Sequence, residues 1–176
     1  LPAEMKDKPN WVIVRTRENA DTGRLDKFLI SPVTGKFAES DNPETWADFD
    51  TACKYARENG GVALAYALDG KDGIACIDLD HCVGEDGKRS ALADEVLSKC
   101  GKTYIESSVS GKGIHVFGKT KGMDLRSFSK DGDMEFYKDG HFIAMTGDGV
   151  GFYDLESFDT PAMKSLLERK LERRTE

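Results

Sequence analysis

Residues 74–80 have the sequence IACIDLD, an apolar run that ends in two aspartates two positions apart. Apolar and β-branched residues between turn signals predict a strand over 73–79. Because side chains alternate along a strand, we expect Asp78 and Asp80 on one face and Ile77 and Leu79 on the other. The chain should therefore present paired carboxylates at the end of an otherwise buried strand.

Outward from this strand, the pattern predicts a mixture of helices and hairpins. Strands are expected over residues 11–16, 27–31, 62–68, 103–107, 114–118, 134–137 and 141–146. Helices are expected from Asn42-Pro43 to Gly60-Gly61, over 90–99, and after Thr160-Pro161. The last four strands should form two hairpins, the second around Asp139-Gly140, a dipeptide favoured in tight turns. Because regular βαβ alternation is missing, the prediction is an α+β fold.

Length and composition suit one catalytic domain over residues 1–159, followed by a charged C-terminal helix over 160–176. The chain begins with Leu1 rather than Met, so we expect a piece of a larger protein with further domains. No apolar run approaches the roughly 20 residues that cross a bilayer, and no signal peptide is recognisable. We expect a cytoplasmic protein without a membrane partner.

The net charge of −7 excludes a uniformly basic protein that coats nucleic acid. Residues 112–130 nevertheless carry five lysine or arginine side chains against Asp124 alone. This cluster is either a solvated face or a local contact for nucleic acid. The four cysteines have no CxxC spacing, which favours free thiols, with a zinc site at Cys82 and Cys100 as the alternative.

The spacing of acidic residues predicts a metal site. Asp78 and Asp80 repel each other unless a cation lies between them, and hard divalent ions prefer oxygen ligands. Alternation in the sequence DMEFY, residues 133–137, puts Asp133 and Glu135 on one face, and Glu135 could supply a third carboxylate. Such a triad could hold two ions, Mg²⁺ or Mn²⁺, for phosphoryl transfer. The alternative is a set of solvated strand ends.

The sequence SSVSGKGIH, residues 107–115, predicts a phosphate-binding loop. Glycines free backbone N–H groups, the serine hydroxyls add donors, and Lys112 adds positive charge. The spacing is not that of a P-loop. His115 begins the next strand and could point back toward the bound group. The alternative is an ordinary hairpin turn with a polar rim.

In this order, the segments IACIDLD (74–80), ESSVSGKGIHVF (106–117) and MEFYKDGHFIAMTG (134–147) resemble the archaeo-eukaryotic primase superfamily. The resemblance is strongest to the primase–polymerase domains at the N-termini of phage and plasmid replication proteins. A weaker match covers KFLISPVTGKFAESDNPETW, residues 27–46. The resemblance implies an RRM-like antiparallel sheet joined to a smaller N-terminal α/β unit, with the site between them.

The resemblance also implies roles for individual residues. Asp78, Asp80 and Glu135 would bind the metal ions. The nucleotide would be held by residues of the loop and of the strand after it, namely Ser108, Ser110, Lys112, Gly113 and His115. His141 stands where the family often has Arg, and it would be a further contact of the nucleotide.

The function that the resemblance implies is a DNA-directed primase–polymerase, a nucleotidyltransferase, in the cytoplasm of a bacterium or of the host of a phage or plasmid. Its expected partners are a single-stranded DNA template with a primer, NTP or dNTP, and a helicase domain or protein. Two alternatives stay open, namely a carboxylate–metal nuclease and a non-catalytic module that binds nucleic acid or nucleotide.

Overall fold

The structure, a computed structural model, describes residues 1–173, with the backbone alone for 129–131. Its strands form two antiparallel sheets. The four-stranded sheet has the order β2-β1-β3-β9, with β1 (Trp11–Glu18), β2 (Leu25–Ile30), β3 (Ala63–Asp69) and β9 (Asp139–Met145). The five-stranded sheet has the order β5-β6-β4-β8-β7, with β4 (Ile74–Leu79), β5 (Ile105–Ser107), β6 (Ile114–Lys119), β7 (Phe128–Asp131) and β8 (Met134–Tyr137).

Side-chain caps define where the three longer helices begin. They are α2 (Phe49–Glu58), α3 (Ala91–Lys99) and α4 (Pro161–Glu172); the short elements α1 (Ala3–Lys6) and η1 (Pro43–Thr45) complete the set. Asp48, Ser90 and Thr160 accept hydrogen bonds from the backbone N–H groups three residues further on. Each such cap contributes about 1 kcal/mol to helix stability.

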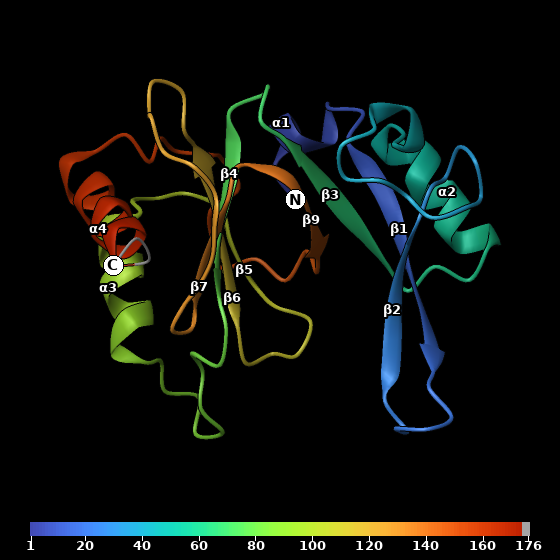
Figure 1. The fold of residues 1–176 in the computed structure, drawn as a ribbon, viewed down its shortest axis with the longest axis horizontal. Coiled ribbons are helices and arrows are strands. Elements are labelled where there is room, and N and C mark those ends of the chain that lie inside the picture. Colours follow the sequence, from blue (N-terminus) through green and yellow to red (C-terminus); the bar gives the residue numbers. More distant parts are fainter. Residues whose placement is uncertain (174–176) are drawn as a thin grey trace.

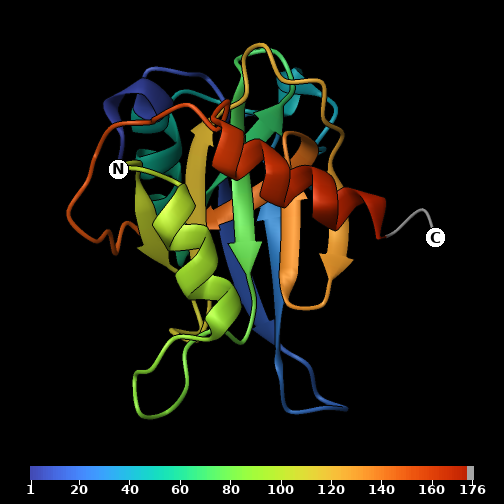
Figure 2. The ribbon, with the colours of Figure 1, turned by 90° about the vertical axis from the view of Figure 1, so that its left-hand side faces the viewer.

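The five-stranded sheet lies between two layers of structure. Figure 1 shows α3 and α4 on one side of this sheet and the four-stranded sheet on the other, and Figure 2 shows the two helices crossing its outer face. Ile77 and Leu79 of β4 are fully buried in the core shared with α3 and α4. Complete burial of such side chains contributes about 1.5–3 kcal/mol each. The opposite face of β4 is left to hold Cys76 and Asp78 toward the four-stranded sheet.

Two expectations from the sequence are wrong. The helix expected from Asn42 is a single 3₁₀ turn, and α2 begins only after Asp48 because Trp46 and Ala47 are extended and Ala47 pairs with Trp11. Residues 134–137 and 141–146 do not form a hairpin. β8 pairs with β4 and β7, whereas β9 crosses to the other sheet and pairs with β3.

The α+β architecture predicted from the sequence agrees with the four α-helices and two antiparallel sheets that residues 1–173 form. Cys76 is fully buried, as its apolar surroundings predict. Within residues 1–173, helices are too short or too polar to cross a bilayer.

Candidate functional site

A row of polar side chains crosses the five-stranded sheet. The strand register places Glu106 opposite His115, His115 opposite Asp78, and Asp78 opposite Glu135, on β5, β6, β4 and β8 in turn. Residues directly opposite in antiparallel pairs project to the same face. These four side chains therefore share one face, the one turned away from α3 and α4.

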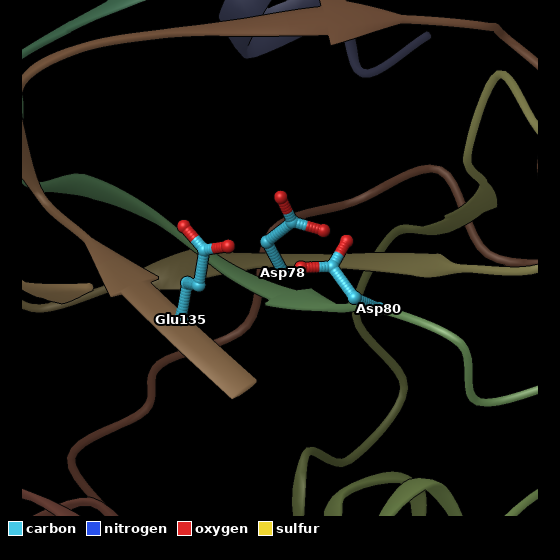
Figure 3. Close-up of side chains that lie close together, drawn as sticks. All are labelled: Asp78, Asp80 and Glu135. Carbon is cyan, nitrogen blue, oxygen red and sulfur yellow. The ribbon is translucent and has the colours of Figure 1, made fainter. Parts of the chain in front are cut away.

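Three carboxylates converge on this face. Asp78, Asp80 and Glu135 each offer an oxygen, and these oxygens lie within 4.8 Å of one another. Figure 3 shows the three side chains standing on the same side of β4 and β8. Asp80 lies just beyond the end of β4, and its backbone N–H donates to the carbonyl of Asp133 (2.7 Å), which keeps it beside β8. Glu135, rather than Asp133, is thus the third member of the group.

The electrostatics of this group are those of crowded, partly desolvated carboxylates. Burial and the neighbouring carboxyls of Glu135 and Asp78 raise the pKa of Asp80 to about 6. Burial also raises the pKa of Asp78, and Glu135 adds to this rise, although His115 and His141 oppose it. A carboxyl group whose pKa is raised in this way lacks compensating positive charge.

This donor set fits a hard divalent cation. All three candidate ligands are carboxylates, the ligand type preferred by Mg²⁺ and Mn²⁺. Among the residues that the structure describes, this is the one cluster of three or more potential ligands. Cys82 and Cys100 are instead buried free thiols in the core with α3 and α4, where they contact the carbonyls of Leu79 and Leu97.

His115 connects the carboxylate group to a second, fully buried acid. Its Nε2 lies 3.6 Å from Asp78 Oδ1, and its Nδ1 lies 3.2 Å from Glu106 Oε2. The side chain of His115 is 8% exposed and that of Glu106 is 0% exposed. Glu106 therefore fixes the orientation of the imidazole ring and leaves Nε2 directed toward Asp78.

Glu106 also joins the two sheets. Besides His115, its carboxylate accepts hydrogen bonds from the Tyr104 hydroxyl (3.0 Å) and from the backbone N–H (2.8 Å) and hydroxyl (3.0 Å) of Thr146. Thr146 directly follows β9, whereas Glu106 lies on β5. Burial alone would raise the pKa of Glu106, but the hydrogen bonds from His115 and Thr146 outweigh it and lower the pKa below its usual value.

Asp78 and Asp80 line a cleft between the two sheets, with a volume of about 260 Å³. Its polar lining comes from β2, β4, β6, β9 and the loop after β5. The polar side chains that line it are Lys27, Asp78, Asp80, Ser108, Ser110, His115 and His141. Of the residues expected to contact a nucleotide, Ser108, Ser110, His115 and His141 therefore face one space.

The glycine-rich loop between β5 and β6 is organised by its own hydrogen bonds. The backbone N–H groups of Gly113 and Lys112 donate to the hydroxyls of Ser108 (3.0 Å) and Ser110 (3.2 Å). A Cβ atom at position 113 would lie 2.7 Å from the carbonyl oxygen of Leu79, so only glycine fits there. Lys112 is exposed on this loop. Direct contacts of Lys112 and Gly113 with a nucleotide stay predictions.

Tyr137 and His141 mark the point where the chain crosses from one sheet to the other. Their rings stack with centroids 3.7 Å apart and an interplanar angle of 7°. The Tyr137 hydroxyl donates to Glu135, and burial and this bond raise the pKa of Tyr137. Burial lowers the pKa of His141, although Glu135 and Asp78 oppose the shift. The stacked pair thus positions one of the candidate metal ligands.

The residues that support the site were not recognised from the sequence. Glu106 follows from hairpin register alone, because a loop over 108–113 places residue 106 opposite residue 115. Thr146 bonds Glu106 between the two sheets, and Tyr137 of β8 stacks on His141 of β9. No local pattern predicts which strands face each other there. Lys27 was noted only as part of the weaker resemblance.

Comparison with protein-family models finds no match for this chain. Comparison with curated proteins finds a similarity to a protein named DNA Primase-polymerase from Nitratiruptor phage NrS-1, to which this chain is 30% identical over 167 aligned residues. The alignment covers 92% of this chain but only 22% of the phage protein. The chain is thus similar, over nearly its full length, to about a fifth of a phage DNA primase-polymerase.

Proposed function

We propose that this chain is the catalytic domain of a DNA-directed primase–polymerase of the archaeo-eukaryotic primase superfamily, extending a nucleic-acid strand from NTP or dNTP. The observation that carries the proposal is the convergence of Asp78, Asp80 and Glu135 beside a cleft that Asp78 and Asp80 line together with serine, histidine and lysine side chains. The similarity to a phage primase-polymerase supports it independently. The strand order β5-β6-β4-β8, with α3 and α4 on one face, is compatible with a primase-like core.

Asp78, Asp80 and Glu135 would hold the divalent ions. Bound there, Mg²⁺ or Mn²⁺ would neutralise phosphate charge and lower the pKa of the attacking hydroxyl. The ions would lie next to the cleft, because the pairing of β4 with β8 holds Asp78 and Glu135 side by side. Phosphoryl transfer needs little covalent help from the protein, so positioning and charge account for most of the catalysis.

The other polar side chains of the cleft would position the triphosphate. The Ser108 and Ser110 hydroxyls and the Nε2 of His115 lie at one wall, and Lys27 and His141 lie at the other. Because Glu106 accepts from Nδ1, Nε2 is the ring nitrogen left for the cleft. Hydrogen bonds of this kind to phosphate oxygens gain strength when the donor is charged.

A primer-extension assay tests this proposal. A labelled primer on a single-stranded DNA template is incubated with NTP or dNTP and with Mg²⁺ or Mn²⁺. We expect incorporation by the wild-type chain and a loss of about a thousandfold or more in Asp78→Asn, since bound ions contribute several kcal/mol. Asp133→Asn is the matched control, because Asp133 is exposed and lies outside the cluster.

Two further reactions separate the alternatives. Incubation with labelled DNA and metal but without nucleotides would reveal a nuclease as metal-dependent shortening of the strand. Omission of the primer tests whether the chain starts strands or only extends them. Incorporation that is unchanged in Asp78→Asn, or absent under every condition, would contradict the proposal.

A further inference from the structure

A second cleft, of about 500 Å³, lies at the other end of β4 from the carboxylates. Four of its lining residues are lysines contributed by separate parts of the chain. Lys8 follows α1, Lys71 lies in the turn between β3 and β4, Lys121 follows β6, and Lys138 lies between β8 and β9. We refer to this feature as the lysine cleft. The fold thus gathers four positive charges that are far apart in the sequence.

In the part of the chain that the structure describes, the lysines of this cleft are free of direct ion pairs, although Asp72 and Asp69 lie within electrostatic reach of Lys8 and Lys71. Within the described residues, none of the four forms an ion pair, whereas nearby Lys119 pairs with Glu4 at 3.0 Å. Lys71 and Lys121 are exposed, and Lys8 and Lys138 are half-buried. Their ammonium groups are therefore available to an external anion.

Two acidic groups, Asp72 in the lining of the lysine cleft and Asp69 next to it, accept hydrogen bonds from the protein itself. Asp72 accepts from the Tyr66 hydroxyl (2.6 Å) through one oxygen and from the Ile74 N–H (2.9 Å) through the other. Asp69 accepts from the N–H groups of Lys71 (2.8 Å) and Asp72 (3.1 Å). These bonds fix the turn between β3 and β4, so Lys71 is presented by an ordered backbone.

The position of the lysine cleft relates it to the carboxylate site. Gly73 lines the cleft and Asp78 lies five residues further along the same chain segment, a distance of about 17 Å at 3.3–3.4 Å per residue. At about 3.4 Å per nucleotide, this distance corresponds to about five nucleotides of a strand. Lys138 also directly follows Tyr137, whose hydroxyl bonds the candidate ligand Glu135.

We propose that the lysine cleft binds the sugar–phosphate backbone of the nucleic-acid strand whose reacting region lies at Asp78, Asp80 and Glu135. This inference rests on the proposed function. Repeated phosphates are the anion that four spaced lysines match best. None of the described residues lining the cleft is aromatic, so the contact is to backbone rather than to stacked bases and does not depend on base sequence.

A binding titration tests the lysine cleft without any need for catalysis. A fluorescent 20-nucleotide oligo(dT) is titrated with the protein in EDTA at several salt concentrations. Lys71→Gln with Lys121→Gln removes two contacts, which should weaken binding by roughly 25-fold at about 0.1 M salt and reduce the salt slope by about 1.4. The matched control is Lys36→Gln with Lys54→Gln, which removes the same charge from exposed positions outside the cleft and should change affinity little.

A second titration separates the two sources of phosphate. dATP with Mg²⁺ should bind the Lys71→Gln/Lys121→Gln variant as tightly as the wild type. Loss of dATP binding with unchanged oligo(dT) binding would reassign the cleft to free nucleotide and overturn the proposal, as would equal oligo(dT) affinity of the test and control variants. Thermal unfolding of both variants shows whether they are folded. If oligo(dT) binding falls as expected but wild-type incorporation is absent, the proposed function fails while the lysine cleft stands.

Discussion

Glu106 and Asp78 are carboxylates on the same face of one sheet, separated only by His115, yet their environments have opposite effects. Glu106 is fully buried and its pKa is lowered; Asp78 is less buried and its pKa is raised. Burial raises the pKa of both groups, so burial cannot explain the difference. Glu106 accepts hydrogen bonds from Tyr104 and Thr146 as well as from His115, whereas Asp78 has His115 Nε2 at 3.6 Å.

The comparison separates a structural acid from a site that lacks positive charge. The donors around Glu106 come from the protein itself, and they join β5, β6 and the end of β9. Asp78 lies instead beside two more carboxylates, Asp80 and Glu135. The protein thus supplies hydrogen-bond donors to Glu106 and few to the group of Asp78, Asp80 and Glu135. A bound cation would balance the negative charge of that group.

The largest effect on stability is expected for Glu106→Gln. Glutamine has nearly the same shape, but its NH₂ group would face N–H and O–H donors that now point at a carboxylate oxygen. We expect a loss of about 2–4 kcal/mol in the free energy of unfolding, measured by urea denaturation at pH 7. Because the pKa of Glu106 is lowered, its contribution is present above the ordinary value of 4.5 and is lost as the pH falls through the lower folded-state pKa.

Glu135→Gln is the control for this variant, since it removes the same charge from the other end of the polar row. It should leave the stability of the metal-free protein unchanged or raise it. Equal stability of Glu106→Gln and wild type would break the comparison, because the hydrogen bonds to Glu106 would then not hold the two sheets together.

The next effect concerns Asp80, whose contribution to stability is smaller than that of Glu106 and changes with pH in the opposite direction. The folded-state pKa of Asp80 is about 6 against an ordinary value of 3.8, so the folded protein binds this proton more tightly. Stability of the metal-free protein should therefore fall as the pH rises from about 4 through 6. Asp80→Asn should reduce this dependence of stability on pH. At pH 7 the substitution should raise the free energy of unfolding by about 1 kcal/mol or less, because solvent screens a partly exposed group. This gain corresponds to a rise in Tm of at most about 2–4 °C.

The same variant tests the affinity for a cation. Mg²⁺ or Mn²⁺ should raise the Tm of the wild-type chain and have little effect on Asp80→Asn, because a ligand that binds only the folded state stabilises it. Asp133→Asn should behave as wild type in both measurements. A metal-induced shift that survives in Asp80→Asn would place the cation elsewhere.

These features differ in how far the sequence alone predicts them. Alternation in IACIDLD predicts the shared face of Asp78 and Asp80, and the Thr160-Pro161 and Ser90 signals predict where α4 and α3 begin. Local patterns suffice here because strand alternation and helix caps depend on a few neighbouring residues. The same patterns fail for β8 and β9, since Asp139-Gly140 favours a hairpin locally while pairing of β9 with β3 is decided by distant residues.

The residues of the candidate site also differ in whether a local sequence pattern predicts them. The three acids follow from alternation on β4 and β8, and the serines follow from the glycine-rich loop. Glu106 follows only once the register of β5 and β6 is known. Tyr137 and Thr146 do not follow from the sequence, because Tyr137 stacks on His141 of the other sheet and Thr146 bonds Glu106 between the sheets. The lysine cleft is similar, since its lysines come from four segments that only the fold brings together.

The last effect, also smaller than that of Glu106→Gln, is expected for Thr146→Val, which removes the Thr146 hydroxyl and keeps the backbone N–H bond to Glu106. The hydroxyl lies 3.0 Å from Glu106 Oε2 and 2.7 Å from the carbonyl oxygen of Ser107, but it has one proton and donates to one of them at a time. We therefore expect a loss of about 1 kcal/mol in the free energy of unfolding, which is the contribution of one hydrogen bond. In the Glu106→Gln background the same substitution should cost measurably less, because the two residues share the bond that is lost. If Thr146→Val alone were as costly as Glu106→Gln, a single hydroxyl would stabilise Glu106, and the contrast with Asp78 would rest on one bond rather than on a set of donors from both sheets.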